Sequence, residues 1–213
     1  NLVVGTYSGG IDIARPVGSA VDIFQQKGQV NQSILNDRVN SVCQSKSGKL
    51  LMGTDNGVSI FDLSSRTWTH TCQGVVVLNF CLTPRGTILA GTYGHGVLEL
   101  TDKGDVHTLY STDNGILQDD HVFRVFYDND GNLWLGGLDG DLVQLTEKGP
   151  RYYPVHYVKD ILQLPDGRIA IGTTYGLIFI NPITGMSEKI TYATKGSKDV
   201  NSFIHTLFLN KNS

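Results

Sequence analysis

The chain has 213 residues, of which 40% are apolar, with 25 glycines and only 6 prolines. This composition is typical of a folded domain rich in turns and excludes a disordered chain. The formal net charge is -3, and Lys and Arg are scattered, which excludes a nucleic-acid-binding surface. The longest apolar stretch, 75–82, is far shorter than the ~20 residues of a membrane helix, so no direct membrane insertion is expected.

A short motif recurs along the chain: two or three apolar residues, then Gly-Thr or Gly-Gly, then another glycine within a few positions. The first glycines of the motif lie 36 to 48 residues apart, at Gly5, Gly53, Gly91, Gly136 and Gly172. A period of about 40–45 residues is that of a four-stranded β-propeller blade. No stretch follows a helical period, so the sequence predicts an all-β fold.

Each repeat is expected to contain the same elements in the same order. A first apolar strand is expected at 39–44, 78–82, 122–127 and 158–164. A tight turn follows and ends in a glycine suited to positive φ, at Gly48, Gly86, Gly131 and Gly167. The second strand carries the recurring glycine, and a third strand is expected at 58–63, 97–100, 142–145 and 177–180. A fourth strand with Tyr, Trp and Thr is expected at 67–72, 106–110, 152–157 and 189–192.

These elements predict one β-propeller domain over residues 1–213, built from about five four-stranded antiparallel blades. Four complete blades are expected at about 37–73, 74–112, 119–154 and 155–195. Segments 1–30 and 200–213 are predicted to share the fifth, since 204–213 reads as a first strand and turn and 1–6 as a second strand. Such pairing would close the ring and remove exposed sheet edges. In the alternative, the chain is a piece of a longer propeller cut at a repeat boundary.

The repeat resembles the two-component regulator propeller repeat, whose pattern is an apolar strand, D-x-x-G-x-L-W-I-G-T and a Gly-Leu strand. The best match is VFRVFYDNDGNLWLGGLDGDL at 122–142. The preceding STDNGILQDD at 111–120 is similar to the family's turn segment, and GTDNGVSIFD at 53–62 is a second match. The resemblance extends over nearly the whole chain.

The resemblance implies the extracytoplasmic sensor region of a membrane sensor kinase, often a hybrid two-component system of gut Bacteroidetes tuned to glycan breakdown products. Sensors of this family usually carry two seven-bladed propellers, a sandwich domain, a membrane helix and a kinase. This chain departs from that plan, with about five expected blades and none of the other parts. Any histidine kinase activity would therefore lie outside these residues.

One face of a propeller carries the turns between second and third strands and those between a fourth strand and the next first strand. Loops on a rigid scaffold hold ligands, aromatic faces stack on sugar rings, and Asp or Asn side chains hydrogen-bond to hydroxyls. Packing of the turn tyrosines on neighbouring turns is the other explanation of their recurrence. The predicted ligand-binding residues are Tyr7, Asp55, Asn56, Tyr93, His95, Asp139 and Tyr175, with Leu138 in the same set of turns.

Signals for catalysis and metal binding are weak. Glycoside hydrolysis needs paired carboxylates, and the expected first strands carry only Asp160. The histidines lack metal-site spacing, and Asp128 and Asp130 lack the spacing of a calcium loop. The odd cysteine count argues against a disulfide framework or a zinc site. We therefore expect no catalytic residue, no metal and no cofactor.

Together these observations predict a non-catalytic sensor propeller, periplasmic or extracellular, that belongs to a two-component signalling protein. Its expected partners are an oligosaccharide ligand and neighbouring domains of the parent sensor, and no nucleic acid. A second hypothesis is a free-standing lectin-like propeller with one sugar site per blade. A third is a polysaccharide lyase or hydrolase.

Overall fold

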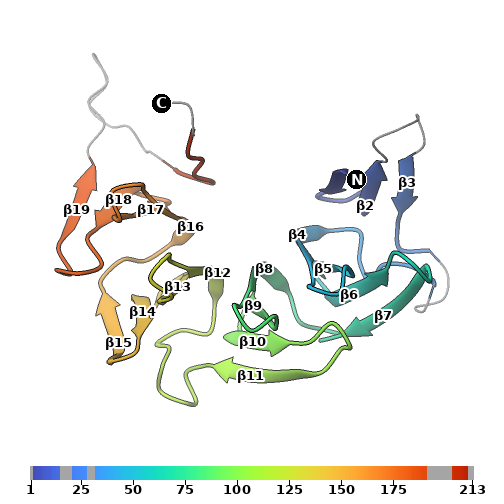
Figure 1. Ribbon diagram of the computed structural model, residues 1–213, viewed down its shortest axis with the longest axis horizontal. Helices are drawn as coiled ribbons and strands as arrows, with labels where there is room; N and C mark the ends of the chain where they lie inside the picture. The colour runs from blue at the N-terminus through green and yellow to red at the C-terminus, as the bar shows by residue number, and fades with distance from the viewer. Residues whose placement is uncertain (1, 15–20, 28–31, 191–202, 211–213) are drawn as a thin grey trace. The chain divides into compact units, whose positions relative to one another are not determined.

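A computed structural model describes residues 2–14, 21–27, 32–190 and 203–210 of the chain (Figure 1). The described residues form five antiparallel sheets, in each of which the strands follow in chain order. No α-helix occurs in this part of the chain, and none of its segments forms a helix able to cross a membrane. The predicted all-β class with four-stranded antiparallel sheets is thus confirmed.

The chain divides into two compact units, residues 1–111 and 112–213. The first unit holds a three-stranded sheet, β1 (Leu2–Gly5), β2 (Ile11–Ala14) and β3 (Val21–Phe24), and two four-stranded sheets. The strands of these two are β4 (Val39–Gln44), β5 (Leu50–Thr54), β6 (Gly57–Asp62), β7 (Thr67–Thr71), β8 (Val77–Leu82), β9 (Ile88–Thr92), β10 (Val97–Leu100) and β11 (Val106–Tyr110).

The second unit holds two four-stranded sheets and the segment 203–210. Its strands are β12 (Val122–Tyr127), β13 (Leu133–Gly137), β14 (Leu142–Thr146), β15 (Gly149–Tyr153), β16 (Val158–Gln163), β17 (Ile169–Thr173), β18 (Gly176–Ile180) and β19 (Ser187–Ile190). The predicted single domain and shared fifth blade remain predictions, and parts of that blade, at 1, 15–20, 28–30, 200–202 and 211–213, lie outside the described residues.

Every four-stranded sheet has an irregularity at the same place in its first strand. In β4, Val39 pairs with Thr54 and Ser41 with Gly53, so that Asn40 is an extra residue in the ladder. Such a β-bulge bends the strand and redirects a side chain. The same shift makes the second residue of each of the other first strands an extra one, at Leu78, Phe123 and Lys159.

Four of the five recurring glycines are required by close approach to the next segment. A Cβ atom on Gly53 would lie 2.7 Å from Cγ1 of Val77, the first residue of the next sheet. Such a contact is too short for two carbon atoms, so only glycine lets the next sheet approach this closely. The equivalent pairs are Gly5 with Val39, Gly136 with Val158 and Gly172 with Ile204, at 2.8, 2.6 and 2.6 Å.

The third residue of a first strand links its sheet to the next one. In the first unit, Ser41 Oγ accepts a hydrogen bond from the backbone N–H of Phe80 at 3.1 Å. In the second unit, the buried Asp160 carboxylate binds Arg124, at 2.7 Å from Nε and 2.6 Å from Nη2. It also accepts hydrogen bonds from Thr206 Oγ1 at 3.0 Å and from the N–H of Leu207 at 2.7 Å. Asp160 therefore ties three segments together.

The segment 203–210 was expected to begin as a first strand, and the structure assigns no strand to it. It nevertheless packs where the next first strand would lie, since the N–H of Ile204 donates to Thr173 O at 3.1 Å and Ile204 covers Gly172. A strand needs a partner for its backbone ladder. Within the described part of the second unit no strand provides that partner, which is why the segment differs from the prediction.

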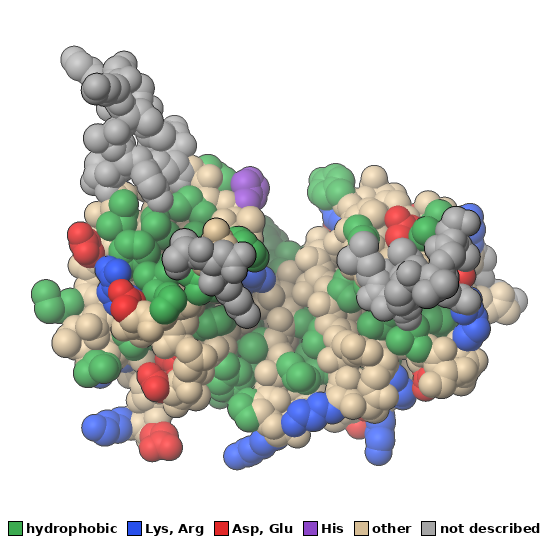
Figure 2. Space-filling view, turned by 45° about the horizontal axis from the view of Figure 1, so that its top comes forward, with side chains coloured by type: hydrophobic (Ala, Val, Ile, Leu, Met, Phe, Trp, Pro, Cys, Tyr) green, Lys and Arg blue, Asp and Glu red, His purple; other side chains and the backbone are tan. Residues whose placement is uncertain are grey.

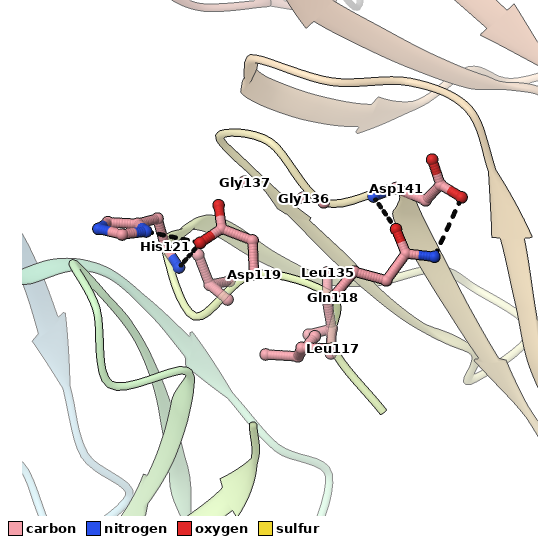
Figure 3. A pocket seen from close by; sticks show the side chains of 10 residues that line it. Leu117, Gln118, Asp119, His121, Leu135, Gly136, Gly137 and Asp141 are labelled. Atoms are coloured by element: carbon pink, nitrogen blue, oxygen red, sulfur yellow. Dashed lines mark hydrogen bonds and ion pairs between the residues drawn. The ribbon is translucent and has the colours of Figure 1, made fainter. Parts of the chain in front are cut away.

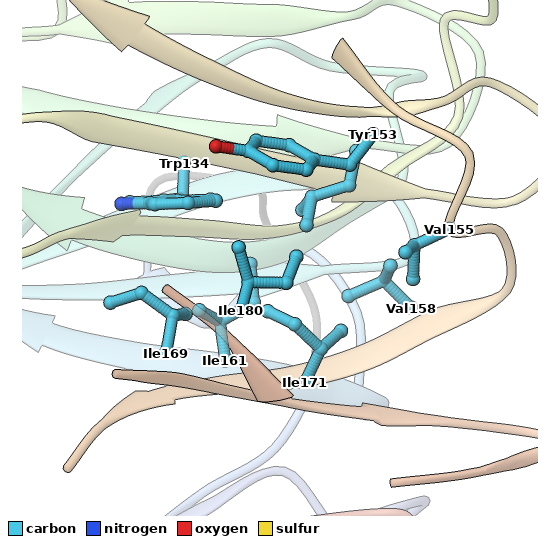
Figure 4. Packing of buried hydrophobic residues seen from close by; sticks show 9 residues of the cluster. Trp134, Tyr153, Val155, Val158, Ile161, Ile169, Ile171 and Ile180 are labelled. Carbon is cyan, nitrogen blue, oxygen red and sulfur yellow. The ribbon is translucent and has the colours of Figure 1, made fainter. Parts of the chain in front are cut away.

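The core consists of side chains packed between successive sheets. Trp134 of β13 is fully buried and packs with Ile161, Ile169 and Ile180 of the next sheet (Figure 4). Its Nε1 donates to the Asp128 carboxylate at 2.9 Å. That carboxylate also accepts hydrogen bonds from the N–H groups of Asp130 and Asn132 at 3.1 and 2.8 Å. Asp128 therefore finds its hydrogen-bond donors within its own turn and in Trp134.

Candidate functional site

The predicted face is organised by backbone hydrogen bonds between two kinds of turn. The residue before each first strand accepts a hydrogen bond from the turn between the second and third strands of the same sheet. The N–H of Tyr93 donates to Val76 O at 3.0 Å, and that of Leu138 to His121 O at 3.1 Å. The equivalent bonds join Asp55 to Arg38 at 3.4 Å and Thr174 to Tyr157 at 3.3 Å. Side chains of both turns are therefore neighbours.

Four of the turns between second and third strands are closed by the threonine of the Gly-Thr pair. Thr54 Oγ1 donates to Gly57 O at 2.9 Å and accepts from the N–H of Asn56 at 3.1 Å. The hydroxyl thus satisfies a backbone donor and a backbone acceptor inside the turn. The same bonds to a backbone carbonyl are made by Thr6, Thr92 and Thr173.

The first unit has a polar hollow of about 440 Å³ that brings two predicted residues together, Tyr7 and Asp55. The Arg38 guanidinium lies 4.4 Å from the centre of the Tyr7 ring and pairs with Asp55 Oδ2 at 2.8 Å. Asn40 Nδ2 donates to the other oxygen of Asp55 at 2.8 Å. The Tyr7 ring is 74% exposed, so one aromatic face stands in solvent beside an arginine and a carboxylate. Gln26 belongs to the same lining.

This arrangement suits a hydroxyl-rich ligand. A sugar ring can stack on the open tyrosine face, and the guanidinium and carboxylate can donate to and accept from its hydroxyls. Arg38 is held on both sides, which reduces the side-chain entropy that is lost on binding. On the face viewed in Figure 2, charged side chains of both signs are interspersed, so no single-sign patch dominates it.

The other predicted residues of the first unit lie on their own turns. Asn56 Oδ1 accepts from the N–H of Gly74 at 3.1 Å, which ties it to the following loop. Tyr93 is 48% exposed and His95 is exposed, and the N–H of His95 donates to Thr92 Oγ1 at 3.1 Å. Tyr93 and His95 are absent from the lining of the Tyr7 hollow.

The second unit brings Asp139 and Tyr175 together through Tyr157, which was not predicted. The Tyr157 and Tyr175 rings meet edge to face at 5.3 Å. Interaction of the Tyr157 hydroxyl with the negatively charged Asp139 carboxylate raises the pKa of Tyr157. Tyr157 has a φ of 56°, a left-handed conformation that is rare outside glycine. Leu138 is half-buried beside them.

The turn after β13 differs, because Gly137 stands where the other turns have threonine. Here the preceding loop braces the turn from outside (Figure 3). Asp119 accepts from the N–H of Asp139 at 3.0 Å, and Gln118 Oε1 from the N–H of Asp141 at 3.1 Å. The space between loop and turn is about 10 Å³, room for at most one water molecule. This place is a structural brace rather than a ligand site.

Asp119 also holds His121, whose Nδ1 lies 2.6 Å from Asp119 Oδ1. Burial of Asp119 opposes its ionisation, but the hydrogen bonds from His121 and from the N–H of Asp139 outweigh it and lower its pKa. The carboxylate is therefore stabilised in its charged form.

Metal ligands do not gather anywhere in the described part of the chain, where no group of three His, Cys, Asp or Glu side chains is placed to hold an ion. Cys43, Cys72 and Cys81 are half-buried thiols, and burial raises the pKa of Cys43 and Cys72. Those two thiols are thus kept in their protonated form, which is a poor metal ligand and nucleophile.

Sequence reasoning missed Arg38, Asn40, Gln26 and Tyr157. The signal for Arg38 and Tyr157 was available, since both directly precede a first strand and that position faces the predicted turns. Asn40 was hidden because the β-bulge that redirects it leaves no trace in the apolar pattern. Gln26 lies in an irregular connection that no motif marks.

Comparison with known proteins supports the repeat assignment. Residues 116–139 match the family model described as "Two component regulator propeller". The resemblance predicted from the sequence is thus confirmed for this repeat, which spans the brace loop, β12, β13 and the following turn. No curated protein matches the chain.

Several solved structures are similar in fold. The extracellular domain of a putative hybrid two-component system from B. thetaiotaomicron superposes with a TM-score of 0.71 at 18% identity, over 96% of this chain and 28% of that one. PorZ, a surface component of the type-IX secretion system of Porphyromonas gingivalis, gives 0.67 at 18% identity, over 98% and 34%. Virginiamycin B lyase from Staphylococcus aureus gives 0.55 at 15% identity, over 74% and 56%.

At these identities the similarities establish the β-propeller fold alone. The chain spans less than a third of the length of the B. thetaiotaomicron domain. What the larger proteins bind or do is therefore a matter for proposal here.

Proposed function

We propose that this chain is a non-catalytic, ligand-binding sensor propeller of a two-component signalling protein, located outside the cytoplasm. The two-component regulator propeller repeat at 116–139 supports the signalling assignment. Similarity to extracellular domains of such systems supports the location. In this proposal, neighbouring domains of the parent protein relay the signal, and the kinase lies outside the chain.

The observation that carries the ligand proposal is the Tyr7 hollow. An exposed aromatic face, an arginine held in place and a carboxylate meet there in a space of about 440 Å³, within the ~300–1,000 Å³ range of ligand pockets. We propose that it binds an oligosaccharide fragment, with a sugar ring stacked on Tyr7 and hydroxyls bonded to Arg38 and Asp55.

The test is calorimetric titration of the purified chain with a panel of oligosaccharides, followed by variants of three tyrosines that lie in turns between second and third strands. Tyr7→Ala should weaken binding about tenfold or more, while Tyr93→Ala and Tyr175→Ala should leave it unchanged. Equal weakening by all three would favour the lectin-like hypothesis with one site per blade. A panel without any binder would contradict the glycan proposal.

The similarity to virginiamycin B lyase raises a second candidate, an enzyme. Asp160, the acidic residue on the first strands, argues against hydrolysis, because Arg124 and backbone N–H groups already engage both of its oxygens. A carboxylate so engaged serves poorly as a general acid or base. Turnover of a polysaccharide panel, lost in Asp160→Asn while the fold is retained, would revive the enzymatic candidate.

A further inference from the structure

The side chain of Lys159 stands in an unusual place in the second unit. In β16, Val158 pairs with Thr173 and Asp160 with Gly172, so Lys159 is the extra residue of the β-bulge. Its equivalents in the other first strands are Asn40, Leu78 and Phe123. Lys159 is thus the bulge residue that brings a positive charge to this position.

Two aromatic rings lie near the ammonium group of Lys159. Its Nζ lies 4.2 Å from the ring centre of Phe123 and 6.0 Å from that of Phe203. The Phe203 ring lies in turn 4.3 Å from the His205 ring, and 48% of Phe203 is exposed. Cation–π attraction to two rings holds the lysine in place, and one of these rings still offers its surface to solvent.

Within the described residues, no nearby acid balances the charge of Lys159. Among the residues that the structure describes, no salt bridge joins Lys159 to a carboxylate. The adjacent Asp160 has both oxygens occupied by Arg124, Thr206 and backbone donors. Partial burial lowers the pKa of Lys159, as expected for a cation drawn out of water without an anionic partner.

This environment favours an incoming anion. The lysine has already lost part of its hydration, so pairing with an anion costs less further desolvation than it would for a free surface lysine. The flat face of Phe203 beside it can stack on a ring of the same ligand. A single ligand that satisfies both features carries a carboxylate on a ring.

We propose that Lys159, Phe123 and Phe203 form a binding site for a ring-borne carboxylate, with a uronic acid residue of an oligosaccharide as the ligand class. The carboxylate pairs with the Lys159 ammonium, and the ring lies against Phe203. None of these three residues lines the Tyr7 hollow. The binding proposed at Lys159 is therefore tested independently of the ligand proposed for the Tyr7 hollow.

The test is a titration of the whole chain with a trigalacturonate and, separately, with the matching neutral trigalactose. Calorimetry and NMR measure the binding. Benzoate serves as the non-sugar ring carboxylate. Trigalacturonate should bind at least about tenfold more tightly than the neutral sugar. Binding of benzoate alone would limit the ligand class to aromatic carboxylates and overturn the uronic acid assignment. Failure of all three probes would overturn the site.

Variants locate the binding. Lys159→Met should weaken trigalacturonate binding about tenfold or more, and Lys159→Arg should retain most of it. Lys148→Met, which removes an exposed lysine from the turn between β14 and β15, is the matched control and should change nothing. Phe203→Ala lies outside the strands and tests the same site if Lys159→Met does not fold. Unchanged affinity in Lys159→Met or in Phe203→Ala would overturn the proposal, whereas Tyr7→Ala should have no effect.

Discussion

The turns that follow β5 and β13 occupy the same place in their sheets and are held by opposite means. After β5, the hydroxyl of Thr54 closes the turn from within. After β13, Gly137 has no side chain, and Gln118 and Asp119 of the preceding loop support the turn from outside. Turns at equivalent places are therefore held by an internal bond in one sheet and by an external brace in the other.

The difference has a steric cause. A Cβ atom on Gly137 would lie 1.9 Å from the carbonyl oxygen of His121, so no other residue fits there without moving the loop. The end of the loop therefore leaves no room for a threonine side chain at this position, and Gln118 and Asp119 of the same loop accept the hydrogen bonds of the turn instead. The family match at 116–139 includes Gln118 and Asp119 of the loop and the first residues of the turn.

A threonine at position 137, in the turn after β13, should have the largest effect on the unfolding free energy. Gly137→Thr restores the pattern of the other sheets but forces the loop away from the turn. We expect a loss of about 3 kcal/mol or more in the free energy of unfolding, measured by urea denaturation. An unchanged midpoint would mean that the loop moves freely and that the comparison is wrong.

Removal of the external brace should rank second. Asp119→Ala deletes the acceptor for the N–H of Asp139 and the partner of His121, and should cost about 1–3 kcal/mol of unfolding free energy. The matched control is Asp113→Ala, an exposed aspartate in the same connection, which should change stability by less than about 0.5 kcal/mol. Equal effects of the two would show that Asp119 braces nothing.

Removal of the internal bond should cost less. Thr54→Val keeps the shape of the side chain and deletes its hydroxyl, which should lower the unfolding free energy by about 1 kcal/mol. Amide hydrogen exchange should show faster exchange at Asn56, whose N–H loses its acceptor. Protection of that N–H equal to the parent's would contradict the assigned role.

The smallest expected effect is a difference in how the unfolding free energy of the parent and of Asp119→Asn depends on acid pH. The pKa of Asp119 lies below its ordinary value in the folded state, so its stabilising effect is complete above the unfolded value of about 3.9 and is lost as the pH falls through the folded value. The parent should lose stability on acidification below about pH 4 more steeply than Asp119→Asn. The comparison between the two proteins cancels the parallel contributions of Asp62, Asp102 and Asp166, whose pKa values are also lowered. If the unfolding free energies of the two proteins fell in parallel with pH, the charge of Asp119 would contribute nothing to the brace.

Much of the fold could be predicted because it depends on local patterns. Gly48, Gly86, Gly131 and Gly167 were placed correctly at positive φ, with values of 91, 95, 81 and 87°. The recurring glycines were recognised by their spacing, but their reason, close approach to the next sheet, is a tertiary contact that the local pattern does not contain. Segment 203–210 shows where prediction from local sequence patterns fails, because an apolar stretch becomes a strand only where a partner strand is present.

The candidate site was predicted less completely, for a physical reason. Tyr7 and Asp55 were chosen as residues of turns between second and third strands, and the structure brings them together through Arg38, which precedes a first strand and was not chosen. Tyr157 joins Asp139 to Tyr175 in the same way. In both places the missed residue directly precedes a first strand. The position before a first strand can be read from the sequence, but the partner of its side chain depends on a backbone hydrogen bond between different elements, which composition and spacing do not reveal.

The glycine at each boundary between sheets also bears on how such chains change in length. Within each unit, the second strand of a sheet carries at Gly5, Gly53, Gly136 or Gly172 the small socket that receives the leading Val or Ile of the next segment. A duplicated or deleted repeat would therefore leave every remaining junction intact. Relatives with this motif can differ in the number of blades while each blade keeps its internal structure.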